Sequence, residues 1–112
     1  MPKNINKIIL VADVGGTNTR IALARNGSID STSIKRYANR EFDSLHAVIK
    51  QYCETLSVDQ ITASCVAIAG PVENGTGRLT NLKWAMDQTG LKQVTGAETV
   101  KIINDLQAQA YA

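Results

Sequence analysis

Three strand-like segments at the start of this chain are joined by turns that are too short for a crossover connection. The first, residues 7–13, is apolar and β-branched, and residues 19–25 and 28–37 follow it closely. Asn26-Gly27, between the second and third segments, is a strong hairpin signal. Parallel neighbours need a connection of about a dozen residues or more, so strands joined this tightly pair antiparallel. The sequence therefore predicts a meander of three antiparallel strands.

Beyond the meander, apolar residues at helical spacing alternate with short buried runs. Apolar residues recur with a helical period from Leu45 to Leu56, and Asp43 or Ser44 can cap the start of that helix. The predicted elements after the meander are a helix over residues 45–56, a strand over 61–69 closed by Gly70-Pro71, a loop over 74–77, a helix between Asp87 and Gly96, a strand over 100–103, and a helix that begins at Asn104-Asp105.

The resulting order of elements, βββαβαβα, defines the expected fold class. A meander followed by strand–helix crossovers makes a mixed α/β sheet with helices on its faces. The chain has 112 residues, which suits one domain with a real core, and it contains no internal repeat, low-complexity segment or linker. We therefore expect residues 1–112 to form a single α/β domain.

The composition excludes several classes of partner. A net charge of +2 without any basic run argues against nucleic acid as a ligand. No apolar run approaches the roughly 20 residues that a membrane-spanning helix needs, and no signal peptide is visible. The two cysteines, Cys53 and Cys65, form no CxxC pair and are interpreted as reduced core thiols. We therefore expect a cytoplasmic protein with neither a nucleic-acid partner nor a membrane anchor.

The first apolar strand ends in a carboxylate, Asp13, and continues into a turn with almost no side chains. Glycines at a strand end allow the backbone to approach a ligand closely, and consecutive N–H groups there form an anion nest. Thr17 and Asn18 add further donors. Asp13 is compatible with a phosphate if a Mg²⁺ ion lies between them, held through water. The alternative is a tight hairpin in which the glycines serve only the turn; the motif is neither GxGxxG nor a P-loop.

A second strand-end carboxylate, Asp105, follows Asn104 near the other end of the sequence. A carboxylate at this position can accept a proton from an alcohol, and the neighbouring amide can hydrogen-bond a hydroxyl as donor and as acceptor. The alternative is that Asp105 only caps a helix. Two strand-end aspartates with different neighbours describe a phosphotransferase, in which one binds metal and phosphate and the other acts on a hydroxyl.

Four motifs, DVGGTNTR, AGPV, TNLKW and IINDLQAQA, occur in this order along the chain. Together they resemble the N-terminal half of bacterial ATP-dependent glucokinases, over essentially the whole sequence. These enzymes belong to the sugar kinase, heat-shock 70 and actin superfamily, whose duplicated ribonuclease-H-like domain has the same βββαβαβα order. The resemblance implies an actin-like ATPase domain of an enzyme that transfers the ATP γ-phosphate to the 6-hydroxyl of glucose, with ATP and Mg²⁺ as cofactors.

The resemblance also assigns roles to individual residues. Asp105 corresponds to the catalytic base and contacts the sugar. Asn104 corresponds to a sugar-binding residue, and Gly70, Pro71 and Asn81 correspond to loops near the sugar pocket. The family's phosphate-binding stretch, extended by two following polar residues, assigns the nucleotide to Ala12, Asp13, Val14, Gly15, Gly16, Thr17, Asn18 and Arg20.

The chain departs from the family in length, because family members carry a C-terminal domain with further sugar contacts and the adenosine pocket. We therefore expect an N-terminal domain that binds sugar and ATP weakly by itself, and that self-associates as a homodimer or associates with a C-terminal domain. Two alternatives stay open: a kinase for another hexose or an N-acetylhexosamine, and a non-catalytic binding module derived from a sugar kinase. An actin-like or chaperone ATPase would not need IIND together with TNLKW.

Overall fold

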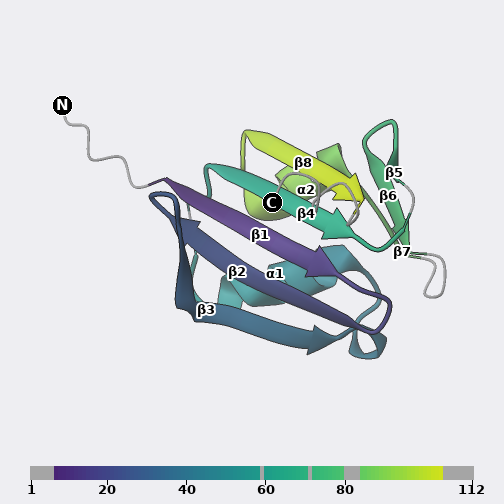
Figure 1. Cartoon of the computed structure of the whole chain (residues 1–112), viewed down its shortest axis with the longest axis horizontal. Helices are drawn as coiled ribbons and strands as arrows, with labels where there is room; N and C mark the ends of the chain where they lie inside the picture. The colour runs from purple at the N-terminus through teal and green to yellow at the C-terminus, as the bar shows by residue number, and fades with distance from the viewer. Residues whose placement is uncertain (1–6, 59, 71, 80–83, 105–112) are drawn as a thin grey trace.

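The computed structural model describes residues 7–58, 60–70, 72–79 and 84–104. Its main sheet has five strands in the order β3-β2-β1-β4-β8, and a separate three-stranded sheet, β5-β6-β7, lies beside it (Figure 1). Two α-helices, α1 and α2, pack against each other behind the main sheet in this view. The architecture is the mixed α/β sheet that the sequence predicts, with one further small sheet.

The predicted meander is confirmed. It consists of β1 (Ile8–Val14), β2 (Asn18–Arg25) and β3 (Ser28–Ala38), paired antiparallel, and each boundary lies within one residue of the predicted one. Asn26 and Gly27 form the turn between β2 and β3 with φ values of 53° and 90°. Both angles are positive, as a tight hairpin of right-handed twist requires, which explains why this pair of residues stands there.

The other half of the main sheet is parallel. Strands β4 (Ala63–Ile68) and β8 (Thr99–Asn104) run in the direction of β1, and Val14, Ile68 and Asn104 are aligned at their carboxyl ends. The three strand ends therefore meet at one edge, where ligands bind in sheets of this kind. Asn104 is still paired within β8, so it is not the first residue of a helix, and the rest of the helix predicted from Asn104-Asp105 lies outside the described residues.

Helix α1 (Leu45–Thr55) confirms the predicted helix and resolves which residue caps it. The hydroxyl of Ser44, and not Asp43, accepts a hydrogen bond from the N–H of Ala47 at 3.1 Å. The cap satisfies one of the N–H groups that a helix start leaves without an internal partner. Neither helix in the described residues is long and apolar enough to cross a membrane.

Helix α2 (Gln88–Thr95) also lies where the sequence predicts it, between its two capping residues. Asp87 accepts a hydrogen bond from the N–H of Gly90 at 2.7 Å, and Gly96 ends the helix with a left-handed φ of 76°. A β-carbon at Gly90 would lie 3.2 Å from the capping oxygen of Asp87 and 3.3 Å from the sulfur of Met86. The glycine weakens the helix locally, but it leaves room for this cap.

The loop predicted at residues 74–77 is wrong, because this segment contains a second Asn-Gly hairpin. Asn74 and Gly75 have φ values of 53° and 76°, as in the first hairpin. A pair of strands this short cannot be recognised from alternation of side chains, although the turn itself carries the signal. The additional sheet consists of β5 (Val72–Glu73), β6 (Thr76–Leu79) and β7 (Trp84–Asp87).

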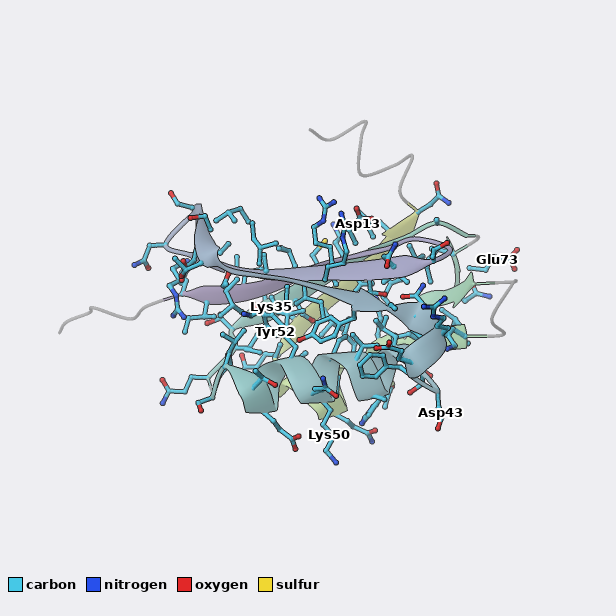
Figure 2. The ribbon with its side chains drawn as sticks, turned by 90° about the horizontal axis from the view of Figure 1, so that it is seen from below. Asp13, Lys35, Asp43, Lys50, Tyr52 and Glu73 are labelled. Atoms are coloured by element: carbon cyan, nitrogen blue, oxygen red, sulfur yellow. The ribbon has the colours of Figure 1, made fainter. Side chains whose placement is uncertain are left out.

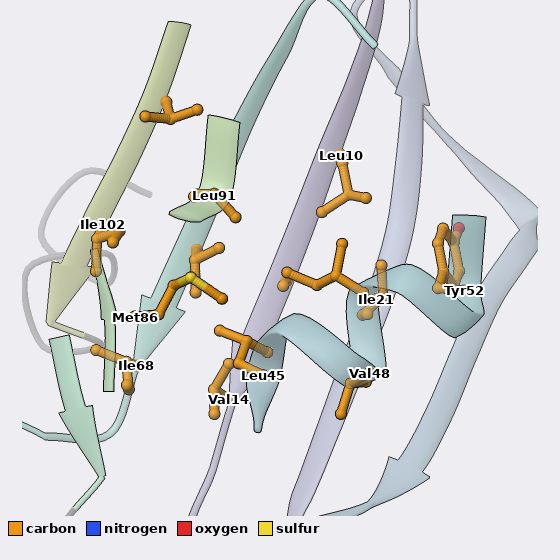
Figure 3. Packing of buried hydrophobic residues seen from close by; sticks show 14 of the residues in the cluster. Leu10, Val14, Ile21, Leu45, Val48, Tyr52, Ile68, Met86, Leu91 and Ile102 are labelled. Atoms are coloured by element: carbon orange, nitrogen blue, oxygen red, sulfur yellow. The ribbon is translucent and has the colours of Figure 1, made fainter. Parts of the chain in front are cut away.

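The core fills the space between the main sheet and the two helices (Figure 3). Leu10 and Val14 point into it from β1, and Val48 and Tyr52 point into it from α1, all with no exposed surface. The alternation of buried and exposed residues along β1 shows that its other face carries Asp13 away from the helices (Figure 2). Each core strand thus has one face for packing and one face for the surface.

The two cysteines are partly buried. Cys53 packs beside the core from α1, and Cys65 lies on β4; both are free thiols in the structure. Burial raises the pKa of each thiol and disfavours the reactive thiolate. Their surroundings are those of structural cysteines.

Tyr52 provides a test of how α1 is attached to the edge strand β3. Its hydroxyl donates a hydrogen bond to the carbonyl of Ser33 at 2.8 Å. We expect Tyr52→Phe to lower the free energy of unfolding by about 1 kcal/mol, because a buried acceptor loses its partner. Tyr37→Phe is the control, since the hydroxyl of Tyr37 makes no hydrogen bond among the described residues. Urea unfolding of both variants measures the difference, and equal stabilities would contradict the expectation.

The same tyrosine gives an expectation for alkaline pH. Burial raises the pKa of Tyr52 above its ordinary value, whereas the unfolded chain ionises at the ordinary value, about 10. Stability from this phenol is therefore complete below about pH 10 and is lost as the pH rises through the folded-state pKa. We expect the stability difference between the native protein and Tyr52→Phe to shrink above pH 10. Urea unfolding at pH 8, 10 and 11 checks this, and a constant difference would contradict it.

Candidate functional site

The candidate site is a cleft of about 340 Å³ at the carboxyl end of β1. It is lined by Asp13, Gly15, Gly16, Thr17, Asn18, Arg20 and Arg36. Six of these seven residues belong to the predicted nucleotide-binding set, and Arg36 does not. The remaining two members of that set, Ala12 and Val14, are buried on the core side of β1, so only their backbone is near the cleft.

The turn between β1 and β2 is closed by its own backbone. The N–H of Gly15 donates to the carbonyl of Asn18 at 2.9 Å, and Gly16 and Thr17 lie exposed at the tip. A β-carbon at Gly15 would lie 3.3 Å from that same carbonyl oxygen, which is tighter than an ordinary contact. The glycine therefore permits a turn that is narrow and has no side chain at its base.

Asn39 holds this turn from behind and was not identified from the sequence. Its side-chain amide donates to the carbonyl of Gly15 at 2.8 Å, and its backbone N–H donates to the carbonyl of Thr17 at 2.9 Å. Its side-chain oxygen accepts from the hydroxyl of Thr19 at 2.7 Å. Asn39 is buried, with only 1% of its surface exposed. This one residue therefore holds Gly15, Thr17 and Thr19 in place through three hydrogen bonds.

The location of Asn39 explains why sequence reasoning missed it. It follows β3 and begins a short 3-10 helix, η1 (Asn39–Glu41), so it is more than twenty residues away from Gly15 along the chain. Nothing in the local pattern distinguishes it from a polar residue in a connection. Only the pairing of β2 with β3 places it against the turn.

Removing the Asn39 side chain tests this role. We expect Asn39→Ala to lower the free energy of unfolding by about 2 kcal/mol, because buried polar groups of Gly15 and Thr19 lose their partner. In this variant, the backbone amide resonances of residues 15–19 should also shift in a ¹H–¹⁵N NMR spectrum. Arg40→Ala, at the exposed next residue, is the control. Equal stabilities and unshifted turn resonances in Asn39→Ala would contradict the assigned role.

Three charged side chains lie in one row across the outer face of the sheet. Asp13 of β1 is opposite Arg20 of β2, and Arg20 is opposite Arg36 of β3. All three are exposed, and none of them takes part in an ion pair within the described residues. The row therefore presents two guanidinium groups and one carboxylate to the cleft.

The ends of β4 and β8 contribute a second group of polar atoms to the same edge. The side-chain amide of Asn104 donates to the carbonyl of Gly70 at 2.8 Å and fixes the start of the loop after β4. The N–H of Ala69 donates to the carbonyl of Val14 at 2.9 Å, so this loop is also bonded to β1. Asn104, Gly70 and the glycine turn are thus connected along one sheet edge.

Some of the predicted site residues cannot be placed. Pro71, Asn81 and Asp105 lie outside the described residues. Among the described residues, no group of three or more His, Cys, Asp and Glu side chains could hold a metal ion. A cation beside Asp13 would therefore need ligands from water or from a bound anion.

The strand order of the main sheet and the glycine turn at the end of β1 define the class of protein. This arrangement is the actin-like ATPase fold, which sugar kinases of the ROK and glucokinase groups share. The sequence profile of the glucokinase family, described as "Glucokinase", matches residues 10–112. The chain belongs to the glucokinase family.

Individual relatives agree with this assignment. The glucokinase of Tolumonas auensis is 40% identical over 106 residues, which cover 93% of this chain and 32% of the relative. The crystal structure of a glucokinase from an Antarctic psychrotroph superposes with a TM-score of 0.80 at 33% identity and covers 94% of this chain and 34% of that one. The chain thus spans about a third of the length of the relatives it matches.

A more distant structure shares the fold alone. It is a ROK family glucokinase from Streptomyces griseus, solved in complex with glucose and AMPPNP. It is 19% identical with a TM-score of 0.65, and the match covers 93% of this chain and 35% of that chain. At this identity the likeness describes the architecture and not the chemistry of the site.

Proposed function

We propose that the protein is the N-terminal part of a glucokinase, which transfers the γ-phosphate of ATP to the 6-hydroxyl of glucose. One observation carries this proposal: in a member of the glucokinase family, the parallel pairing of β1, β4 and β8 brings the glycine turn and Asn104 to one edge of the sheet. A phosphate-binding element and a hydroxyl-binding element on one edge suit transfer between two ligands.

The glycine turn is assigned to the phosphate groups of the nucleotide. The tip of the turn is exposed, and Asn39 holds the turn from the opposite side. An anion could therefore reach the exposed side of the turn without a change in the backbone. Phosphoryl transfer depends mainly on positioning and on neutralising charge. Mg²⁺ commonly keeps several waters and contacts one or two carboxylates and phosphate oxygens, so Asp13 would hold it through water. This ion would neutralise charge on the phosphates.

The sugar is assigned to the ends of β4 and β8. The hydrogen bond from Asn104 to the carbonyl of Gly70 holds this side chain at the end of β8. An asparagine amide is a group that can bind a sugar hydroxyl as donor or as acceptor. Asp105 is the next residue along the chain, and it would take the proton of the 6-hydroxyl as the oxygen attacks phosphorus. Pro71 and Asn81 complete the proposed set of sugar contacts. The two carboxylates, Asp13 and Asp105, therefore have separate tasks.

The rest of the proposed active site belongs to a second domain. Since the chain spans about a third of its relatives, we propose that a C-terminal domain closes over this edge. Closure of this kind excludes water and completes the set of contacts. By itself the chain should bind ATP and glucose weakly and turn over little. A homodimer is a further way to cover this edge of the sheet. We also propose that the protein acts in the cytoplasm.

A fusion tests the proposed activity. We expect this chain, joined to the remaining two thirds of the Tolumonas auensis glucokinase, to form ADP in a glucose-dependent manner with ATP and Mg²⁺. Asp105→Asn should lower kcat by about 100-fold or more, because it removes the general base. Asp43→Asn is the matched control, since Asp43 is exposed on the helix side of the sheet, away from the site (Figure 2).

The outcomes separate the alternatives. Full activity of Asp105→Asn in the fusion would rule out the proposed base. Faster turnover with another hexose or an N-acetylhexosamine would assign a different sugar. Unchanged binding of a protein partner by the Asp105→Asn chain, with no turnover in the fusion, would indicate a non-catalytic module.

A further inference from the structure

We propose that Arg36 is a further phosphate-binding residue, which works with Arg20 to bind the phosphate chain of the nucleotide beside the glycine turn. This inference rests on the proposed function and extends it to a residue of β3. Arg36 belongs to none of the four motifs that relate this chain to its family. The structure, and not the motif pattern, brings it to the site.

The register of three strands gives the first argument. Arg20 is directly opposite both Asp13 and Arg36, so the three side chains leave the sheet on the same face. Neighbouring strands lie about 5 Å apart, which places the backbone of Arg36 about 10 Å from that of Asp13. An arginine side chain extends over much of this distance. Accordingly, Arg36 lines the same cleft as Gly15 and Gly16.

The balance of charge gives the second argument. Like charges directly opposite each other destabilise the pairing of two antiparallel strands. Arg20 of β2 and Arg36 of β3 are such a pair of like charges. Asp13 is the only acidic side chain that lines the cleft among the described residues. The ion pair of Arg25 with Asp30 at 3.2 Å, at the other end of β2, involves neither Arg20 nor Arg36. A bound polyanion would relieve this repulsion.

The chemistry of the side chains gives the third argument. Guanidinium groups match the oxygens of phosphate through paired N–H bonds, whereas an ammonium group acts as a point charge. Two arginines side by side, next to the exposed glycine turn, suit a chain of linked phosphates better than a single orthophosphate. Asp13 stands in the same row, so this binding should require Mg²⁺.

Inorganic tripolyphosphate with Mg²⁺ is the probe for this proposal. A ¹H–¹⁵N NMR titration of the whole chain, at fixed ionic strength, reports binding at the amides of residues 15–18 even when affinity is weak. We expect Arg36→Gln to raise the Kd about fivefold, the size typical of one exposed charge contact. Arg36→Lys should raise it less, because the charge is kept.

Lys35→Gln is the matched control. Lys35 carries the same charge on the same strand, but it is opposite Ile21, whose side chain points into the core, so it leaves the sheet on the other face. Figure 2 shows it on the helix side, away from Asp13. We expect the Kd of the Lys35→Gln variant for tripolyphosphate to stay within about twofold of the native value. Spectra that match outside the cleft show that all variants are folded.

Three results would overturn the proposal. If Arg36→Gln and Lys35→Gln have the same Kd while residues 15–18 still respond, phosphate binds the turn without Arg36, and the proposed kinase function is untouched. If tripolyphosphate does not perturb the turn in the native chain, the phosphate cradle fails as well. If glucose 6-phosphate shows the Arg36 dependence and tripolyphosphate does not, the residue binds a sugar phosphate and not the nucleotide chain.

Discussion

The candidate site depends on the two different pairings of β1. On one side β1 pairs antiparallel with β2, which places the glycine turn directly at its carboxyl end. On the other side it pairs in parallel with β4, which in turn pairs with β8. The parallel half carries its own strand ends to the same edge. A sheet that was wholly antiparallel or wholly parallel would not bring a tight turn and two open strand ends together.

The turn itself is shaped by burial as much as by its glycines. Gly15 and Gly16 permit the narrow path, but the hydrogen bonds of Asn39 select one conformation from those that glycine allows. These bonds lie behind the turn, and the Asn39 side chain that makes them is buried. If the turn binds an anion as proposed, a conformation fixed in this way would need little rearrangement on binding.

The sequence predicted the elements with a strong local signal and missed those that depend on distant contacts. The hairpin at Asn26-Gly27 and the caps of α2 are set by neighbouring residues, and they are confirmed. The small second sheet has strands too short to show a period, so it was missed, and residues 74–77 within it were predicted as a loop. Asn39 and Arg36 were missed because only the strand register brings Asn39 behind the glycine turn and Arg36 to the cleft.

The two faces of β1 explain how this chain combines a packed core with an open cleft. Leu10 and Val14 on one face are completely buried against the helices, and Asp13 on the other face is exposed. A substitution on the outer face therefore changes charge at the cleft with little effect on packing, whereas the inner face tolerates no such change. The row of Asp13, Arg20 and Arg36 can accordingly vary in charge independently of the core, because the sheet separates these side chains from it.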